Sequence, residues 1–132
     1  MTLILPITAV YASLLALLAV MLALVVMKLR SSLRIGLGDG GNRDLSRAIR
    51  VHGNALESIP LFIVLLGIYE LNHASATALH FFGAVFLLSR VLHAWGLFSS
   101  GGTSPGRLIG TAGTYICLLG LAIGNLLKLF SA

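Results

Sequence analysis

The sequence predicts an all-α integral membrane protein, one domain of residues 1–132 built as a bundle of four membrane-spanning helices. Hydrophobic residues make up 58% of the chain and charged residues only 10%, whereas a soluble domain carries roughly 25% charged residues. The apolar residues gather in four stretches, at about residues 3–27, 44–70, 76–97 and 105–130. Each stretch can cross a bilayer, since a span needs about 20 mainly apolar residues.

The formal net charge of +5 does not indicate a nucleic-acid partner. The basic residues flank or enter the apolar stretches instead of forming a separate patch, and cytoplasmic loops of membrane proteins collect Lys and Arg. The single cysteine, Cys117, cannot form an intrachain disulfide, so we expect a small buried packing residue. The lipid bilayer is the expected partner of most of the surface, and we expect no metal site.

The first span carries no charged residue between residues 3 and 27. No Lys or Arg precedes it, and it ends in Lys28 and Arg30 instead of a small-residue cleavage site. We therefore expect a retained span and not a signal peptide. A basic, glycine-rich connector follows, up to Arg43, and because no strand precedes it we expect a flexible cytoplasmic loop and not a phosphate-binding loop.

The second span begins with polar residues and becomes apolar only from about residue 58. Asn42 or Asp44 can cap the helix at its start. At about 100° per residue, four polar side chains fall within roughly 80° of one another and form one stripe. These are Arg47, Arg50, Asn54 and Glu57. Pro60 follows, and it can kink the helix because it removes a backbone hydrogen bond.

The third span contains Arg90 and His93, which are three residues apart and so share one helix face. Before the fourth span, Ser104 and Pro105 resemble a helix cap followed by proline at the first helical position. The fourth span includes two GxxxG spacings, which often accompany close helix packing in lipid. They are formed by Gly106 with Gly110 and by Gly120 with Gly124.

The distribution of charge predicts the orientation of the bundle. Lys and Arg crowd the first connector, and Arg107 borders the third, whereas the second connector and the N-terminal tail carry none. By the positive-inside rule, the first and third connectors face the cytoplasm and both termini lie outside it.

This orientation brings charged residues of separate spans to the cytoplasmic half of the bilayer. The arginines concerned are Arg47, Arg50, Arg90 and Arg107, with Glu57 as a nearby acid and Asp44 at the entrance. Charges inside spans suggest function, and arginine binds carboxylates through two parallel hydrogen bonds. We expect a small polyanionic cosubstrate from the cytoplasm and a lipophilic second substrate from the bilayer.

The same polar residues could instead have purely structural roles. Arg47 could anchor the helix at the lipid headgroups, and Arg50, Asn54 and Glu57 could form a packing network between helices. His93 suits an interhelical hydrogen bond as well as a ligand contact.

Residues 47–60, Arg-Ala-Ile-Arg-Val-His-Gly-Asn-Ala-Leu-Glu-Ser-Ile-Pro, resemble the signature of the MAPEG family, the membrane-associated proteins of eicosanoid and glutathione metabolism. The matching pattern is R-x-H-x-N-x-x-E followed closely by proline at the start of the second of four spans. The pair of Arg90 and His93 and the position of Arg107 are also similar, and the Gly-Asp-Gly-Gly connector at residues 38–41 looks like the bacterial branch.

The resemblance implies a homotrimer that holds glutathione between neighbouring subunits near the cytoplasmic side. The glutathione-binding residues would be Arg50, Asn54, Glu57, His93 and Arg107, with Arg47 and Arg90 supporting the site and Lys28 reaching it. The implied activity is a glutathione transferase or peroxidase that conjugates glutathione to lipophilic electrophiles or reduces lipid hydroperoxides. A cationic pocket suits this chemistry, because it lowers the pKa of a thiol.

The chain departs from several eukaryotic members of that family. It has Gly53 in place of an arginine, and Leu97, Leu108 and Thr111 in place of a tyrosine, a hydroxyl residue and a second tyrosine. Catalytic candidates are Arg107, Thr111 and Tyr115. The alternatives are a non-catalytic glutathione- or lipid-binding membrane protein, a haem carrier using His52 and His93, and a small exporter, whose usual acid in the first span is missing. The expected location is the bacterial inner membrane.

Overall fold

The computed structural model describes residues 3–99 and 104–130, and these residues form four helices and no strand. The helices are α1 (Pro6–Leu33), α2 (Arg43–Leu71), α3 (Ala76–Ser99) and α4 (Pro105–Phe130). Each is long and apolar enough to cross a membrane. The predicted all-α, four-helix fold is therefore confirmed.

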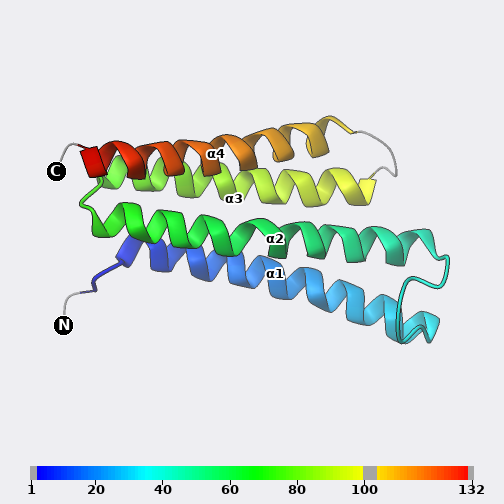
Figure 1. Cartoon of the computed structure of the whole chain (residues 1–132). Coiled ribbons are helices and arrows are strands. Elements are labelled where there is room, and N and C mark those ends of the chain that lie inside the picture. The colour runs from blue at the N-terminus through cyan, green and yellow to red at the C-terminus, as the bar shows by residue number, and fades with distance from the viewer. Residues whose placement is uncertain (1–2, 100–103, 131–132) are drawn as a thin grey trace.

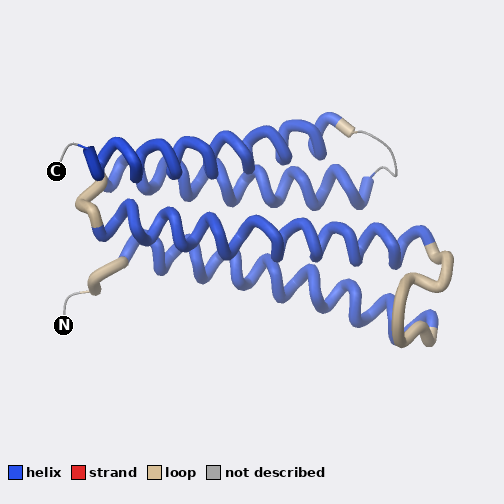
Figure 2. The backbone as a smooth tube through the Cα atoms, viewed as in Figure 1, coloured by secondary structure: helices blue, strands red, loops and turns tan. Residues whose placement is uncertain are grey.

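The helices run side by side and alternate in direction (Figure 1). Both termini lie at one end of the bundle together with the short α2–α3 turn, and the longer α1–α2 connector lies at the opposite end (Figure 2). The end of α3 and the start of α4 also lie at this connector end. The polar first half of α2, the last turns of α3 and the first turn of α4 therefore approach one end of the molecule.

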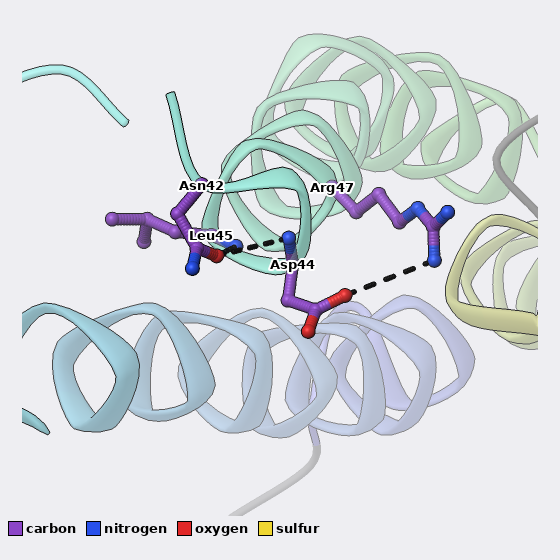
Figure 3. A network of polar contacts seen from close by, with 4 residues as sticks. All are labelled: Asn42, Asp44, Leu45 and Arg47. Carbon is purple, nitrogen blue, oxygen red and sulfur yellow. Dashed lines mark hydrogen bonds and ion pairs between the residues drawn. The ribbon is translucent and has the colours of Figure 1, made fainter. Parts of the chain in front are cut away.

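The starts of the helices follow local sequence signals. The side chain of Asn42 accepts hydrogen bonds from the backbone N–H groups of Asp44 and Leu45, both at 3.0 Å, which caps α2 (Figure 3). Ser104 accepts a hydrogen bond from the N–H of Arg107 at 3.3 Å, and Pro105 occupies the first helical position of α4. Such caps satisfy N–H groups that have no partner within the helix.

The start of α1 is capped from a distant part of the chain. Glu70, near the end of α2, accepts hydrogen bonds from the N–H groups of Ile7 at 3.0 Å and Thr8 at 2.7 Å. A carboxylate is favourable there because the N-terminus of a helix carries a partial positive charge.

The first helix extends beyond its apolar stretch, and the second is not interrupted by its internal proline. The helical conformation of α1 continues past residue 27 to Leu33, and Arg34 ends it in the left-handed conformation with φ 56°. The second helix runs through Pro60 without interruption.

The core lies along the axis of the bundle. Phe62 of α2 and Phe86 of α3 are fully buried and stack with ring centroids 3.8 Å apart. Cys117 is buried in the core, as predicted. Large apolar side chains such as Leu17 and Leu119 are instead exposed on the outside, which is the arrangement expected of a protein whose solvent is lipid.

Candidate functional site

A hollow of about 190 Å³ lies between α2, α3 and α4. The predicted site residues in its lining are Asn54 and Glu57 from α2, Arg90 and His93 from α3, and Thr111 and Tyr115 from α4. Among the described residues, Ser58, Leu61, Thr114 and Leu118 also line it, and none of these four was predicted from the sequence. The hollow thus joins polar residues that are up to about sixty positions apart in the chain.

Arg90 is the charged centre of this hollow, and only 4% of its surface is exposed. Its Nη1 donates a hydrogen bond to the Thr114 hydroxyl and its Nη2 donates to Nδ1 of His93, both at 3.2 Å. Its Nε is buried and has no hydrogen-bond partner within the described part of the chain. No carboxylate of these residues lies within ion-pair distance of Arg90. The buried guanidinium is therefore held by neutral groups and keeps an unused donor.

The contact with Arg90 determines the tautomer of His93. A guanidinium has hydrogen-bond donors and no acceptor, so Nδ1 of His93 must accept and carries no proton. The neutral ring then carries its proton on Nε2. His93 is nearly buried and lines the hollow, so it can act there as a neutral hydrogen-bond donor toward an acceptor on a ligand.

Close packing of α3 and α4 brings Thr114 to Arg90. A Cβ added at Gly110 would lie only 2.5 Å from the Ser89 carbonyl oxygen and 2.6 Å from the His93 backbone nitrogen. Only glycine fits such a backbone approach. Thr114 lies one turn further along the same face of α4, and its hydroxyl donates to the Gly110 carbonyl at 2.8 Å while it accepts from Arg90.

A second hollow, of about 500 Å³, adjoins the first at the start of α4. Its described lining includes Ser104, Pro105, Arg107, Leu108 and Thr111. Thr111 lines both the polar space around Arg90 and this more apolar space.

Four predicted site residues do not line the first hollow: Arg107, which lines the second, and Arg47, Arg50 and Lys28, which line neither. Arg47 is half-buried and approaches Asp44 at 3.8 Å (Figure 3), and Arg50 and Lys28 are exposed. The reason is depth along the helix, because Arg50 lies about 10 Å before Glu57 at a rise of 1.5 Å per residue. The polar residues of the α2 stripe therefore share one face of the helix but lie at different depths, and only Asn54 and Glu57 reach the hollow.

Comparison with known proteins identifies the family of this chain. The model of the MAPEG family matches residues 8–127, nearly the whole chain. The chain belongs to the MAPEG family.

Bacterial proteins are among its relatives. Inner membrane protein YecN of Escherichia coli strain K12 is 38% identical over 120 residues, which cover 91% of this chain and 90% of the relative. The protein of the same name from Escherichia coli O6:H1 matches to the same extent. Uncharacterized protein sll1147 of Synechocystis is 33% identical over 89 residues, which cover 67% of this chain and 62% of that protein.

The structure also locates the positions at which this MAPEG protein departs from the eukaryotic pattern. Leu97 is 6% exposed and belongs to the core, so that position offers the hollow neither volume nor a hydroxyl. Leu108 is 72% exposed and contributes an apolar wall to the second hollow. Thr111 and Tyr115 are the remaining hydroxyl groups among the catalytic candidates, and both line the first hollow.

The haem alternative has less support from the geometry. His52 is half-buried and does not line the hollow that contains His93, whose Nδ1 is already engaged by Arg90. Within residues 3–99 and 104–130, no group of three or more His, Cys, Asp or Glu side chains could hold a metal ion.

Proposed function

We propose that this chain is a glutathione-dependent enzyme of the bacterial inner membrane, which conjugates the thiol to lipophilic electrophiles or reduces lipid hydroperoxides. The observation that supports the proposal best is the buried Arg90, which has an unused donor and no acid within ion-pair distance among the described residues. Membership of the MAPEG family and the inner membrane relatives add to it.

The polar groups of the first hollow complement the charges of glutathione. The tripeptide carries two carboxylates, one ammonium group and a thiol. Arg90 and the Nε2 proton of His93 would meet an anionic group, and the carboxylate of Glu57 would meet the ammonium group. Asn54 adds an amide that can both donate and accept.

The size of the hollow supports an assembly of several copies. About 190 Å³ is below the roughly 300–1,000 Å³ that is typical of small-molecule pockets. The rim residues Leu61 and Tyr115 are exposed in a single chain. We therefore propose a homotrimer in which a neighbouring copy closes the space, and in which the exposed Arg50 also contacts the tripeptide.

The second hollow suits the lipophilic substrate. It lies beside the first, shares Thr111 with it and contains Arg107. In conjugation, the glutathione thiolate attacks an electrophilic carbon and forms the S–C bond while that carbon expels a leaving group such as a halide ion. Where the electrophile is an activated alkene, the C=C π bond breaks instead and the neighbouring carbon takes up a proton from water. In peroxide reduction, two glutathione molecules become a disulfide while the hydroperoxide becomes an alcohol and water. Arg107, Thr111 and Tyr115 are the groups proposed to stabilise the thiolate.

Binding can be tested by the thermal unfolding of the purified protein in detergent. Millimolar glutathione should raise the unfolding midpoint of the wild type, since a ligand at 100 times its dissociation constant stabilises by about 2.7 kcal/mol. Arg50→Ala should abolish this rise, whereas Arg43→Ala, an equal loss of charge at the start of α2, should retain it. No rise in the wild type would reject the glutathione site.

The second candidate function is non-catalytic binding of glutathione or lipid. It is favoured by the absence of a hydroxyl group at Leu97 and Leu108. A panel of electrophiles and hydroperoxides separates the two functions: glutathione binding without turnover of any of them would exclude the enzyme and retain the binding protein.

A further inference from the structure

The α3 side of the first hollow offers hydrogen-bond donors and no acceptor. Arg90 and His93 both line the hollow. A guanidinium has no acceptor, and Nδ1 of His93 already accepts from Arg90, so both side chains can only donate to a ligand. Arg90 is buried, and its Nε has no partner among the described residues. This side of the hollow therefore fits an anionic group.

The α2 side of the same hollow carries the opposite charge. Glu57 lines the hollow, and across residues 3–99 and 104–130 no basic side chain lies within ion-pair distance of it. Its charge acts on that of Arg90 at longer range. An ionised carboxylate can only accept hydrogen bonds. This side of the hollow therefore fits a cationic donor such as an ammonium group.

Two of the hydroxyl groups in the lining are already bonded to the backbone. Thr114 donates its proton to the Gly110 carbonyl at 2.8 Å, and Ser58 donates its proton to the Asn54 carbonyl at 3.1 Å. Arg90 and Glu57 remain as the charged groups of the described lining, and their charges sum to zero. A ligand group with one positive and one negative charge can pair both of them.

Glutathione has such a group at only one of its ends. Its γ-glutamyl residue carries an ammonium group and a carboxylate on the same carbon, whereas its glycine carries a carboxylate alone. With the glycine end in the hollow, Glu57 would stay unpaired, and an unpaired charge is costly where water is excluded. The volume of about 190 Å³ also suits one end of the tripeptide better than the whole molecule, since pockets for complete small molecules measure roughly 300–1,000 Å³.

We propose that the first hollow recognises the zwitterionic γ-glutamyl head of the thiol, so that the substrates are γ-glutamyl thiols as a class and not glutathione alone. This inference rests on the proposed function. The carboxylate of the head meets Arg90 and His93, and its ammonium group meets Glu57. The cysteine extends toward Thr111, which lines both hollows, and the glycine stays outside the first hollow. γ-Glutamylcysteine, which lacks the glycine, should therefore serve as well as glutathione.

The test compares thiols by the concentration at which each raises the thermal unfolding midpoint of the full-length protein in detergent, with every thiol kept reduced. γ-Glutamylcysteine should bind within about threefold of glutathione. Three other compounds should bind at least about tenfold more weakly, since each leaves a charge of the hollow unpaired. Cysteinylglycine lacks the whole head, glutaryl-cysteinylglycine lacks its ammonium group, and γ-aminobutyryl-cysteinylglycine lacks its carboxylate.

Glu57→Gln tests which side chain pairs with the ammonium group. Glutamine keeps the shape of the side chain without its charge, so the preference for glutathione over glutaryl-cysteinylglycine should fall from at least about tenfold to less than about threefold. The preference over γ-aminobutyryl-cysteinylglycine should remain. Asp44→Asn is the matched control, because it removes an acid from the same helix outside the hollow. It should keep both preferences.

The possible results separate this proposal from the glutathione site itself. If cysteinylglycine or glutaryl-cysteinylglycine binds as well as glutathione, or if γ-glutamylcysteine binds at least about tenfold more weakly, the assignment of the head is overturned while the glutathione site stands. An unchanged preference in Glu57→Gln overturns it too. A rise with γ-glutamylcysteine but none with glutathione would support the recognition of the head and reject glutathione as the thiol. No rise with any of these thiols would reject both.

Discussion

The hydrogen bond between Arg90 and Thr114 can be removed by Thr114→Val, a change that nearly preserves the shape of the side chain. Hydrogen bonds to charged groups are worth about 1.5–3 kcal/mol in soluble proteins, whereas polar contacts between membrane helices average about 0.6 and reach about 1.7 kcal/mol. Arg90 is charged, buried and already carries an unpaired Nε. We therefore expect a loss of about 1–2 kcal/mol, at the upper end of the range in membranes.

The free energy of unfolding is measured by titrating the protein in mild detergent with a denaturing detergent. Thr111→Val is the control, because it makes the same substitution on the same helix and beside the same hollow, whereas the hydrogen bond of Arg90 goes to Thr114. It should change the free energy of unfolding by less than about 0.5 kcal/mol.

A double-mutant cycle isolates the interaction. In an Arg90→Met background, Thr114→Val should cost much less than it does in the wild type, because the donor is gone. The reasoning fails if Thr114→Val and Thr111→Val have the same cost, or if the cost of Thr114→Val is unchanged in the Arg90→Met background.

Two further predictions concern packing and capping. Gly110→Ala should lower the free energy of unfolding by about 1–3 kcal/mol, since its Cβ would meet the backbone of α3 at Ser89 and His93. Gly53→Ala, which adds a Cβ where nothing lies within 4 Å, should be neutral or stabilise by up to about 1 kcal/mol; equal effects of the two would contradict the close approach of α3 and α4. Glu70→Gln should destabilise by about 0.5–2 kcal/mol by weakening the cap of α1, and hydrogen exchange at Ile7 should rise with it, whereas unchanged exchange would argue against the cap.

The four membrane-spanning helices could be predicted because the hydropathy of a segment indicates whether lipid or water surrounds it. The ends of the helices were harder, since a helix can continue after its apolar stretch stops. In α1 the residues that follow Met27 keep helical backbone hydrogen bonds while their side chains turn polar. The cap supplied by Glu70 could not be predicted, because it depends on α1 and α2 lying side by side across more than sixty residues of sequence.

The polar hollow was only partly predictable. Helical periodicity places Asn54 and Glu57 on one face of α2, and antiparallel topology brings Arg90 and His93 to the same half of the bundle. Helical periodicity predicts which way a side chain points around the helix axis, but not which helices are in contact. The hydrogen bond from Arg90 to the Thr114 hydroxyl was therefore not predicted. A signal was present, because Thr114 follows Gly110 by four residues and so extends the row of small residues that faces α3.

The close contact between α3 and α4 at Gly110 also affects the proposed glutathione site. Gly110 allows the backbone of α4 to approach Ser89 and His93, and this approach brings the Thr114 hydroxyl to Nη1 of Arg90. Arg90 in turn fixes the proton of His93 on Nε2. A substitution that widens the α3–α4 contact should therefore weaken glutathione binding without touching the ligand. Gly110→Ala should reduce the glutathione-dependent rise of the unfolding midpoint even where the variant remains folded, and an unchanged rise would show that the hollow does not depend on this helix contact.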